Sequence, residues 1–308
     1  MSWICKNCET ENPDAMEVCE VCSSTKPVFL FTEETIYGDI REYYSIDNVE
    51  YHTLGYYTGG DALSRVPANY SKNIFEIPNF VSEIGSDAFK GCFMLREIVI
   101  PNSVKAIGDS AFYDCTNLEQ LTIPESVCSI DADPDTASSA GSWPFWGCSS
   151  LQTISVSPNN KVYDSRNNCH AIIKTSDNKL VLGCCNTIIP DSVYSIGSRA
   201  FRDCASLKRL AIPKSVVVIE AEAFTGCISL EEITLPTSLK WIYCDAFSSC
   251  SSLKQIKIPQ SVRCIGANLF FGCNLLQTIY IHPKLDENVL IQLKGELAPK
   301  LQFKYYVD

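Results

Sequence analysis

Four cysteines near the start of the chain have the spacing of a metal site. They form two Cys-x₂-Cys pairs, ten residues apart, at Cys5, Cys8, Cys19 and Cys22. Four thiolates in two such pairs close a tetrahedral zinc site with no open position for a substrate, so the metal would be structural. A segment this short cannot build a hydrophobic core, and zinc binding would supply its folding free energy. The sequence therefore predicts one zinc ion in a finger at residues 1–26.

The residues around these cysteines read W-x-C-x₂-C-x₃-N-x₆-C-x₂-C from Trp3 to Cys22. This stretch resembles the zinc fingers of the Ran-binding-protein type. The resemblance implies that Trp3 packs beside the metal and that Asn12 braces the loop between the two cysteine pairs. A generic rubredoxin-like zinc ribbon is the alternative interpretation.

Fingers of this type bind ubiquitin or single-stranded RNA, and the residues for neither activity are present here. The ubiquitin binders carry a Thr-Phe pair directly after the second cysteine, where this chain has Glu9 and Thr10. The RNA binders carry arginines between the cysteine pairs, where this chain has Glu11, Asp14 and Glu17. We therefore expect a structural finger that docks another protein. A finger that binds nucleic acid or ubiquitin, carried on a repeat spacer, is the alternative.

The other residues that could do chemistry form no catalytic motif. His52, His170 and His282 are scattered, with no nucleophile or carboxylate at a motif spacing beside them. The sequence contains no glycine-rich phosphate loop and no dinucleotide fingerprint. Aspartates at 131–135 imitate the start of a calcium loop, but the glycine and glutamate that such a loop needs are absent. We expect a solvated loop there, and a protein that is not an enzyme.

The element that must carry these residues is a repeat with a period of 23 residues, represented by Leu95–Asn117. One such unit cannot bury its own apolar side, whereas several stacked units can. The recurring positions are Pro78, Pro101, Pro124, Pro190, Pro213, Pro236 and Pro259; Phe89, Phe112, Phe201, Phe224, Phe247 and Phe270; and Cys92, Cys115, Cys204, Cys227, Cys250 and Cys273.

Each unit changes character along its length. Leu95, Ile98 and Ile100 are spaced as L-x-x-I-x-I, whose last three residues alternate as in a half-buried strand. Pro101 ends the strand because proline has no N–H for a ladder. The segment 109–115 has apolar residues at one-turn spacing, which predicts a short helical or 3₁₀ segment. Gly108 invites a left-handed conformation, but equivalent positions hold residues with side chains, so we expect no positive φ there.

The unit resembles the leucine-rich repeats of the BspA type, A-F-x-x-C-x-x-L-x-x-I-x-I-P-x-S-V-x-x-I-G. The resemblance implies a β-rich, α/β-type leucine-rich-repeat solenoid with 23-residue coils, about nine in number. We predict four regions: a zinc finger at 1–26, a linker and N-terminal cap at 27–71, the solenoid at 72–283 with insertions near 131–143 and 157–186, and a C-terminal cap at 284–308. Within these, Thr175-Ser176-Asp177-Asn178 predicts a hairpin turn, 288–297 a helix and 301–307 a last strand.

The chain has 17 cysteines, and seven of them, Cys148 included, occupy the same repeat position. We expect these seven to form a buried column of thiols. Disulfides between adjacent coils, which would lie about 5 Å apart, are the alternative.

Charge and hydropathy limit the partners. The formal net charge is −11, and residues 1–50 hold eleven Asp and Glu against three Lys and Arg, which disfavours nucleic acid and anionic membranes. No apolar run reaches the roughly 18 residues of a membrane span, and the first residues lack the pattern of a secretion signal. We expect a cytoplasmic monomer.

What remains is the outward face of the predicted strands, where solenoids commonly contact proteins. We expect a protein-binding scaffold that uses this face, with an unidentified protein as partner. A surface adhesin, which would need a secretion signal, is a further alternative. The candidate binding residues are Glu97, Gln120, Thr153, Arg209, Glu232, Gln255, Lys257, Thr278 and Tyr280.

Overall fold

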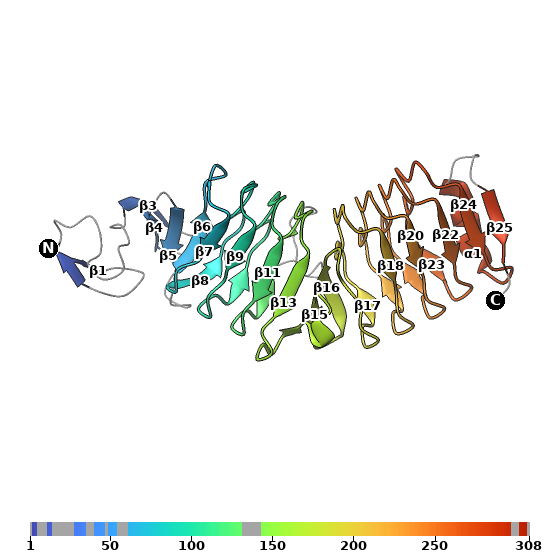
Figure 1. Cartoon of the computed structure of the whole chain (residues 1–308), viewed down its shortest axis with the longest axis horizontal. Helices are drawn as coiled ribbons and strands as arrows, with labels where there is room; N and C mark the ends of the chain where they lie inside the picture. The colour runs from blue at the N-terminus through green and yellow to red at the C-terminus, as the bar shows by residue number, and fades with distance from the viewer. Residues whose placement is uncertain are drawn as a thin grey trace. The chain divides into compact units, whose positions relative to one another are not determined.

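The protein is a β-solenoid in two compact units. The computed structural model describes residues 2–4, 11–13, 28–34, 40–46, 49–53, 61–130, 143–296 and 302–306. Unit 1 comprises Met1–Asn117 with Ile123–Trp146, and unit 2 comprises Leu118–Thr122 with Gly147–Asp308. Figure 1 shows successive coils within each unit. The units together hold about ten turns of some 23 residues. This is one turn more than the sequence repeats predicted, because a strand ahead of them already runs parallel to the first repeat.

Unit 1 begins with an antiparallel meander that turns into a parallel ladder. β3 to β6 pair antiparallel in sequence order, and β6 then pairs parallel with β8, which continues through β10 to β12. Leu63, Ile84 and Ile107 lie in register along the parallel part and are fully buried. The strands of this sheet are β3 (Val28–Glu34), β4 (Ile40–Ile46), β5 (Val49–Thr53), β6 (Asp61–Arg65), β8 (Val81–Ile84), β10 (Ala106–Ile107) and β12 (Ser129–Ile130).

Unit 2 has a sheet built in the same way. Its second and third strands, β15 and β16, form the antiparallel hairpin that the sequence predicted, and β16 then pairs parallel with β17. The hairpin therefore starts a new ladder and covers its core. Gly183 of β16 leaves room for the ring of Phe201, which a Cβ at this position would overlap. The strands are β14 (Tyr163–Asp164), β15 (Ala171–Lys174), β16 (Lys179–Gly183), β17 (Ser195–Ile196), β19 (Val218–Ile219), β21 (Trp241–Ile242) and β23 (Cys264–Ile265).

The opposite side of the coils carries the strands that precede the repeat proline. β7 pairs parallel with β9 in unit 1, and β18 with β20 and β22 with β24 in unit 2. Near the N-terminus a separate two-stranded antiparallel sheet joins β1 (Ser2–Ile4) to β2 (Glu11–Pro13). The remaining strands are β7 (Ile74–Glu76), β9 (Glu97–Val99), β11 (Gln120–Ile123), β13 (Thr153–Val156), β18 (Arg209–Ala211), β20 (Glu232–Thr234), β22 (Gln255–Ile258), β24 (Thr278–Ile281) and β25 (Gln302–Tyr305).

A column of stacked phenylalanine rings forms the centre of each unit. In unit 1, Phe89 and Phe112 stack with ring centroids 5.2 Å apart and an interplanar angle of 8°. In unit 2, Phe224 lies between Phe201 at 5.1 Å and Phe247 at 5.3 Å, and Phe270 follows at 5.9 Å. The spacing is slightly larger than the strand-to-strand distance, so one ring per coil fills the core without a gap.

Six of the seven repeat cysteines are buried as predicted and Cys273 is partly exposed, and the structure gives a reason for their residue type. The Sγ–H groups of Cys115, Cys227 and Cys250 donate to the carbonyl oxygen of the phenylalanine 26 residues earlier, at 3.1, 3.1 and 3.2 Å. Each thiol therefore satisfies a buried carbonyl of the neighbouring coil. The alternative, disulfides between adjacent coils, is not observed, since none of the thirteen cysteines that the structure describes forms a disulfide.

Three of the repeat serines also join neighbouring coils, whereas Ser103 and Ser215 at the same turn position are buried without a hydrogen-bond partner. The hydroxyls of Ser126, Ser238 and Ser261 donate to the carbonyl oxygen 22 residues earlier, at 2.6, 2.8 and 2.8 Å. In these three turns the serine thus joins two coils and does more than form its own turn.

The prediction of a helical or 3₁₀ segment at 109–115 was wrong. These residues form consecutive turns, because Ser110 and Asp114 have positive φ of 51° and 56°, which a right-handed helix excludes. Both positions recur in other coils, for example at Glu222 and Gly226. Gly108 has no positive φ, as predicted; a Cβ there would lie 2.9 Å from the backbone nitrogen of Ser86, so close packing of the coils favours glycine.

The C-terminal end contains the predicted helix and strand. α1 (Glu287–Glu296) buries Val289 and Leu293 against the unit 2 core, and β25 then pairs parallel with β24. Among the described residues no helix has the length and apolar character that a membrane crossing requires. The predicted solvated loop with the aspartates at 131–135 lies outside the described residues.

Candidate functional site

The structure places the candidate residues on the strands that precede the repeat prolines. Gln120, Thr153, Arg209, Glu232, Gln255 and Lys257 are exposed, and Glu97 and Tyr280 are partly exposed. Between these positions the chain buries an isoleucine or leucine on each strand, such as Ile98, Leu210 and Ile256. The alternation that sequence periodicity predicts is therefore present in both units.

Thr278 does not share this exposure. It is 9% exposed because β24 is paired on both sides, with the longer Gln255 and Gln302 directly beside Thr278 in register. We therefore leave it out of the binding surface described below. The outward residues of β18, β20, β22 and β24 that remain form what we call the unit 2 face: Arg209, Ala211, Glu232, Thr234, Gln255, Lys257 and Tyr280.

The parallel ladder under the unit 2 face has a break. β18 pairs with β20, and β22 pairs with β24 and β25, but no ladder joins β20 to β22, although both strands are described in full. The short strands of the same two coils, β21 and β23, remain paired, with Ile242 opposite Ile265. The two coils are therefore joined by a ladder on one side, and lie next to each other without a ladder on the side that carries the candidate residues.

Two adjoining grooves lie on the unit 2 face. The first, of about 200 Å³, is lined by Arg209, Leu210, Ala211, Glu232 and Thr234. The second, of about 350 Å³, lies over the break and is lined by Glu232, Ile233, Thr234, Leu235, Gln255, Ile256, Lys257 and Tyr280. Glu232 and Thr234 line both, so the two grooves form one continuous depression lined by residues of four strands, β18, β20, β22 and β24. Sequence periodicity could align these residues but gave no sign of the break or of the hollow.

The charges on this depression are only loosely paired. Arg209 Nε lies 3.7 Å from Glu232 Oε2, which is longer than a hydrogen bond, and both side chains are mostly exposed, at 75% and 62%. Exposed pairs of this kind contribute little to stability. The Glu232 carboxylate therefore keeps most of its capacity to accept hydrogen bonds.

Lys257 is held from the C-terminal side by a residue that the sequence did not point to. Its ammonium lies 3.6 Å from the ring centroid of Tyr306, close enough for a cation–π interaction. The Tyr306 hydroxyl donates to the carbonyl oxygen of Ile258 at 3.2 Å, and His282 packs edge-on against the ring at 5.5 Å. Tyr306 follows β25, so the C-terminal cap reaches back to the unit 2 face.

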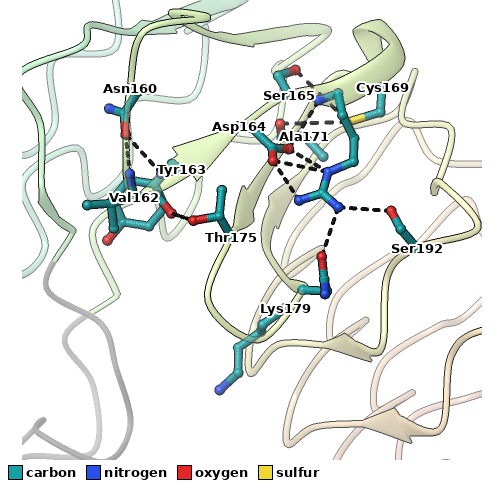
Figure 2. A network of polar contacts seen from close by, with 12 residues as sticks. Asn160, Val162, Tyr163, Asp164, Ser165, Cys169, Ala171, Thr175, Lys179 and Ser192 are labelled. Atoms are coloured by element: carbon teal, nitrogen blue, oxygen red, sulfur yellow. Dashed lines mark hydrogen bonds and ion pairs between the residues drawn. The ribbon is translucent and has the colours of Figure 1, made fainter.

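A second polar cluster, shown in Figure 2, ties the hairpin of unit 2 to the next coil. Arg166 donates through Nε and Nη2 to Asp164, and through Nη1 to Asn178 at 2.8 Å and Ser192 at 3.0 Å. The hydrogen bond and charge of Asp164 raise the pKa of the guanidinium. Arg166 has acceptors on all three nitrogens, so this cluster acts as a structural clasp between the hairpin and the next coil.

Cysteines near the hairpin are also structural. The Cys184 thiol donates to the carbonyl oxygens of Gln152 and His170 at 3.2 and 3.4 Å. Burial raises the pKa of the Cys184 thiol to about 11, so the thiol stays protonated near neutral pH and is a poor nucleophile. Among the described residues no group of three or more His, Cys, Asp and Glu side chains could hold a metal ion.

The predicted zinc ligands Cys5, Cys8, Cys19 and Cys22 lie outside the described residues. The backbone around them is described in part. β1 and β2 pair antiparallel with Trp3 opposite Asn12, and Cys5 and Cys8 lie between these two strands in the sequence.

Comparisons with known proteins agree with this architecture. A family profile described as BspA type Leucine rich repeat region matches residues 68–168 and 183–288, in 6 copies. No curated protein sequence matches the chain significantly.

Solved structures with the same kind of repeat are similar. A leucine rich cell surface protein from Faecalibacterium prausnitzii A2-165 superposes with a TM-score of 0.58 and 26% identity, over 77% of this chain and 60% of that chain. The pneumococcal vaccine antigen PcpA superposes with a TM-score of 0.51 and 17% identity, over 85% of this chain and 98% of that chain. At 17% identity the second likeness concerns the fold alone.

Proposed function

Because the chain belongs to the BspA-type leucine-rich repeat family, we propose that it is a non-enzymatic scaffold that binds another protein through the strand face of its solenoid. The observation that supports this most directly is the unit 2 face, an exposed polar surface hollowed by two adjoining grooves. A core of stacked rings and hydrogen-bonded coils holds this face rigid. A rigid surface loses little conformational freedom on binding, which favours recognition of a partner.

Crosslinking in the native host followed by mass spectrometry tests this proposal. The intact chain is compared with one that carries Arg209→Glu and Lys257→Glu, which reverse two charges of the unit 2 face. We expect crosslinks from a protein partner to residues of this face, and a clear change in their yield in the variant, because both reversals alter the charge that the partner meets. A partner that crosslinks elsewhere and survives both reversals would refute the proposed face. A matched control is Lys105→Glu, an exposed lysine of unit 1 that does not lie on this face.

The absence of catalysis is part of the same proposal. Buried thiols such as Cys184 and Cys227 donate to backbone carbonyls. The Arg166 guanidinium donates to Asp164, Asn178 and Ser192 of the hairpin clasp. None of these groups is left to act as a nucleophile, base or anion-binding residue.

We also propose that the N-terminal segment binds one zinc ion through Cys5, Cys8, Cys19 and Cys22. The donor set supports this, because four thiolates suit zinc and leave no open coordination position. The pairing of β1 with β2 supports it further, since it places the backbones of Trp3 and Asn12 opposite each other, the two residues that the finger type requires. The finger would then be a second, structural docking module.

A surface adhesin is the second candidate function. It is favoured by the similar structure from F. prausnitzii, which is named a cell surface protein. The partner would then be a host or matrix protein in place of a cytoplasmic one. Protease treatment of intact cells separates the two: cleavage of this chain would favour the adhesin, and full protection in intact cells with cleavage in lysed cells would favour the cytoplasmic scaffold.

A further inference from the structure

The groove over the break between β20 and β22 has the chemistry of a pocket for one cationic side chain. At the neighbouring junctions the backbone N–H before each strand donates to the previous coil, as Glu231 does to Lys208 and Gln277 to Lys254, each at 2.9 Å. In the described chain no such bond joins Lys254 to Glu231. The ladder is missing here although the two coils remain in contact, so backbone groups that would otherwise pair border the groove.

Hydrogen-bond acceptors dominate the groove wall on the β20 side. Glu232 contributes a carboxylate, and Thr234 a hydroxyl, to both adjoining grooves. Gln255 on β22 adds a side-chain amide, whose oxygen is a further acceptor. On the far side Tyr280 lines the groove, and the face of a tyrosine ring attracts cations.

Size and shape limit the occupant. A volume of about 350 Å³ lies at the lower end of the range for ligand sites, which suits a single long side chain and excludes a large cofactor. The side chains around it change from small to large across the break. Ala211 and Thr234 leave space on one side, and Lys257 and Tyr280 form a wall on the other.

We infer that this groove takes the guanidinium of an arginine side chain presented by the protein partner. This rests on the proposed function, that the strand face binds a protein. A guanidinium has five N–H donors in a rigid fork, which match the Glu232 carboxylate together with nearby neutral oxygens, and its flat face stacks on an aromatic ring. A lysine ammonium satisfies fewer of these acceptors and does not stack.

Overall charge cannot replace this local fit. Residues 147–308 hold 17 Lys and Arg against 13 Asp and Glu, so the part of the chain that carries the groove does not attract cations by its net charge. Lys257 lines the groove as well, and its ammonium opposes a cationic ligand although the Tyr306 ring engages it. The selectivity for arginine must therefore come from Glu232 and the acceptors beside it.

The test uses the full chain and N-acetyl-arginine amide as the probe, with the neutral N-acetyl-citrulline amide as its isosteric control. Binding is followed by NMR of isoleucine methyl groups, because Ile233 and Ile256 line the groove. We expect saturable shifts of these two methyls with the arginine probe and binding about tenfold weaker with citrulline, as the loss of a charge-assisted pair implies. Equal binding of the two probes would overturn the inference.

Two substitutions with opposite expected effects on binding decide whether the ligand is cationic. Glu232→Gln should weaken binding of the arginine probe about three- to tenfold, because it removes one exposed carboxylate. Lys257→Gln should strengthen binding of the same probe, because a repelling ammonium is removed. Glu125→Gln is the control, since Glu125 is an exposed carboxylate of unit 1 outside the candidate strand residues and its loss should leave binding unchanged. Reversed signs for Glu232 and Lys257 would mean an acidic ligand and overturn the inference.

The outcome separates this inference from the proposed function. If the native partner crosslinks to the unit 2 face but its binding is unaffected by Glu232→Gln, the arginine pocket is wrong and the strand-face scaffold stands. If the partner crosslinks elsewhere while the arginine probe binds the groove as expected, the proposed face is wrong for that partner and the chemistry of the pocket stands.

Discussion

The ring column of unit 2 makes a sharp prediction for Phe224→Ala. Phe224 is completely buried and stacks between Phe201 and Phe247, at centroid distances of 5.1 and 5.3 Å. The substitution removes a ring that packs against the equivalent rings of both neighbouring coils. It leaves the backbone bonds of the coil intact, including the 2.8 Å bond from the Phe224 N–H to the carbonyl oxygen of Ala246.

The expected cost follows from this environment. Replacement of a buried phenylalanine by alanine costs about 3–5 kcal/mol through lost transfer free energy and the cavity left behind. The upper part of this range applies here, because two ring pairs are lost and each contributes about 0.5–1.5 kcal/mol beyond its buried area. The cavity cannot collapse easily, since hydrogen bonds fix the coils on both sides at their spacing. We therefore expect a loss of about 4–5 kcal/mol.

Urea unfolding followed by circular dichroism measures this loss. Phe271→Ala is the matched control, because Phe271 lies in the same unit but its side chain is 70% exposed, and its removal should change stability by less than about 0.5 kcal/mol. The Phe224→Ala midpoint should fall clearly below that of both the control and the parent chain. If the two variants unfolded at the same urea concentration, the ring column would not be the core of this unit.

The remaining predictions concern the metal and the thiols. Protein purified under reducing conditions without chelator should contain one zinc ion per chain, and chelation should release it while the circular dichroism of the solenoid persists; a ratio near zero would remove the zinc site. Native alkylation followed by peptide mapping should label the exposed Cys128, Cys244 and Cys264 well before the buried thiols, and rapid labelling of Cys184 would contradict its burial. Burial raises the pKa of the Cys92 and Cys184 thiols to about 11 from 9.0. Between these values the unfolded chain loses protons that the folded chain retains, so stability should fall as the pH rises from 9 to 11, and Cys184→Ser should make that fall shallower.

Sequence determined the solenoid because its contacts are repeated at a fixed separation. A residue of one coil meets its equivalent 23 positions away, so the phenylalanine and cysteine periods are themselves the contact pattern. The same logic predicted the hairpin after Lys174 and the C-terminal helix, whose turn chemistry and apolar spacing are local. It also excluded a positive φ at Gly108, since equivalent coils carry larger residues there.

Tertiary structure decided the features for which a local sequence pattern is compatible with two backbone conformations or indicates none. Residues 109–115 have apolar spacing that suits a helix, but burial of Phe112 in the column and the thiol bond of Cys115 to Phe89 require a tighter path with positive φ at two positions. The break between β20 and β22 has no counterpart in the repeat, because a hydrogen-bond register depends on the spacing of two coils and not on either sequence alone. The groove, the engagement of Lys257 by Tyr306 and the burial of Thr278 follow from that three-dimensional arrangement, since each brings together residues that periodicity cannot relate.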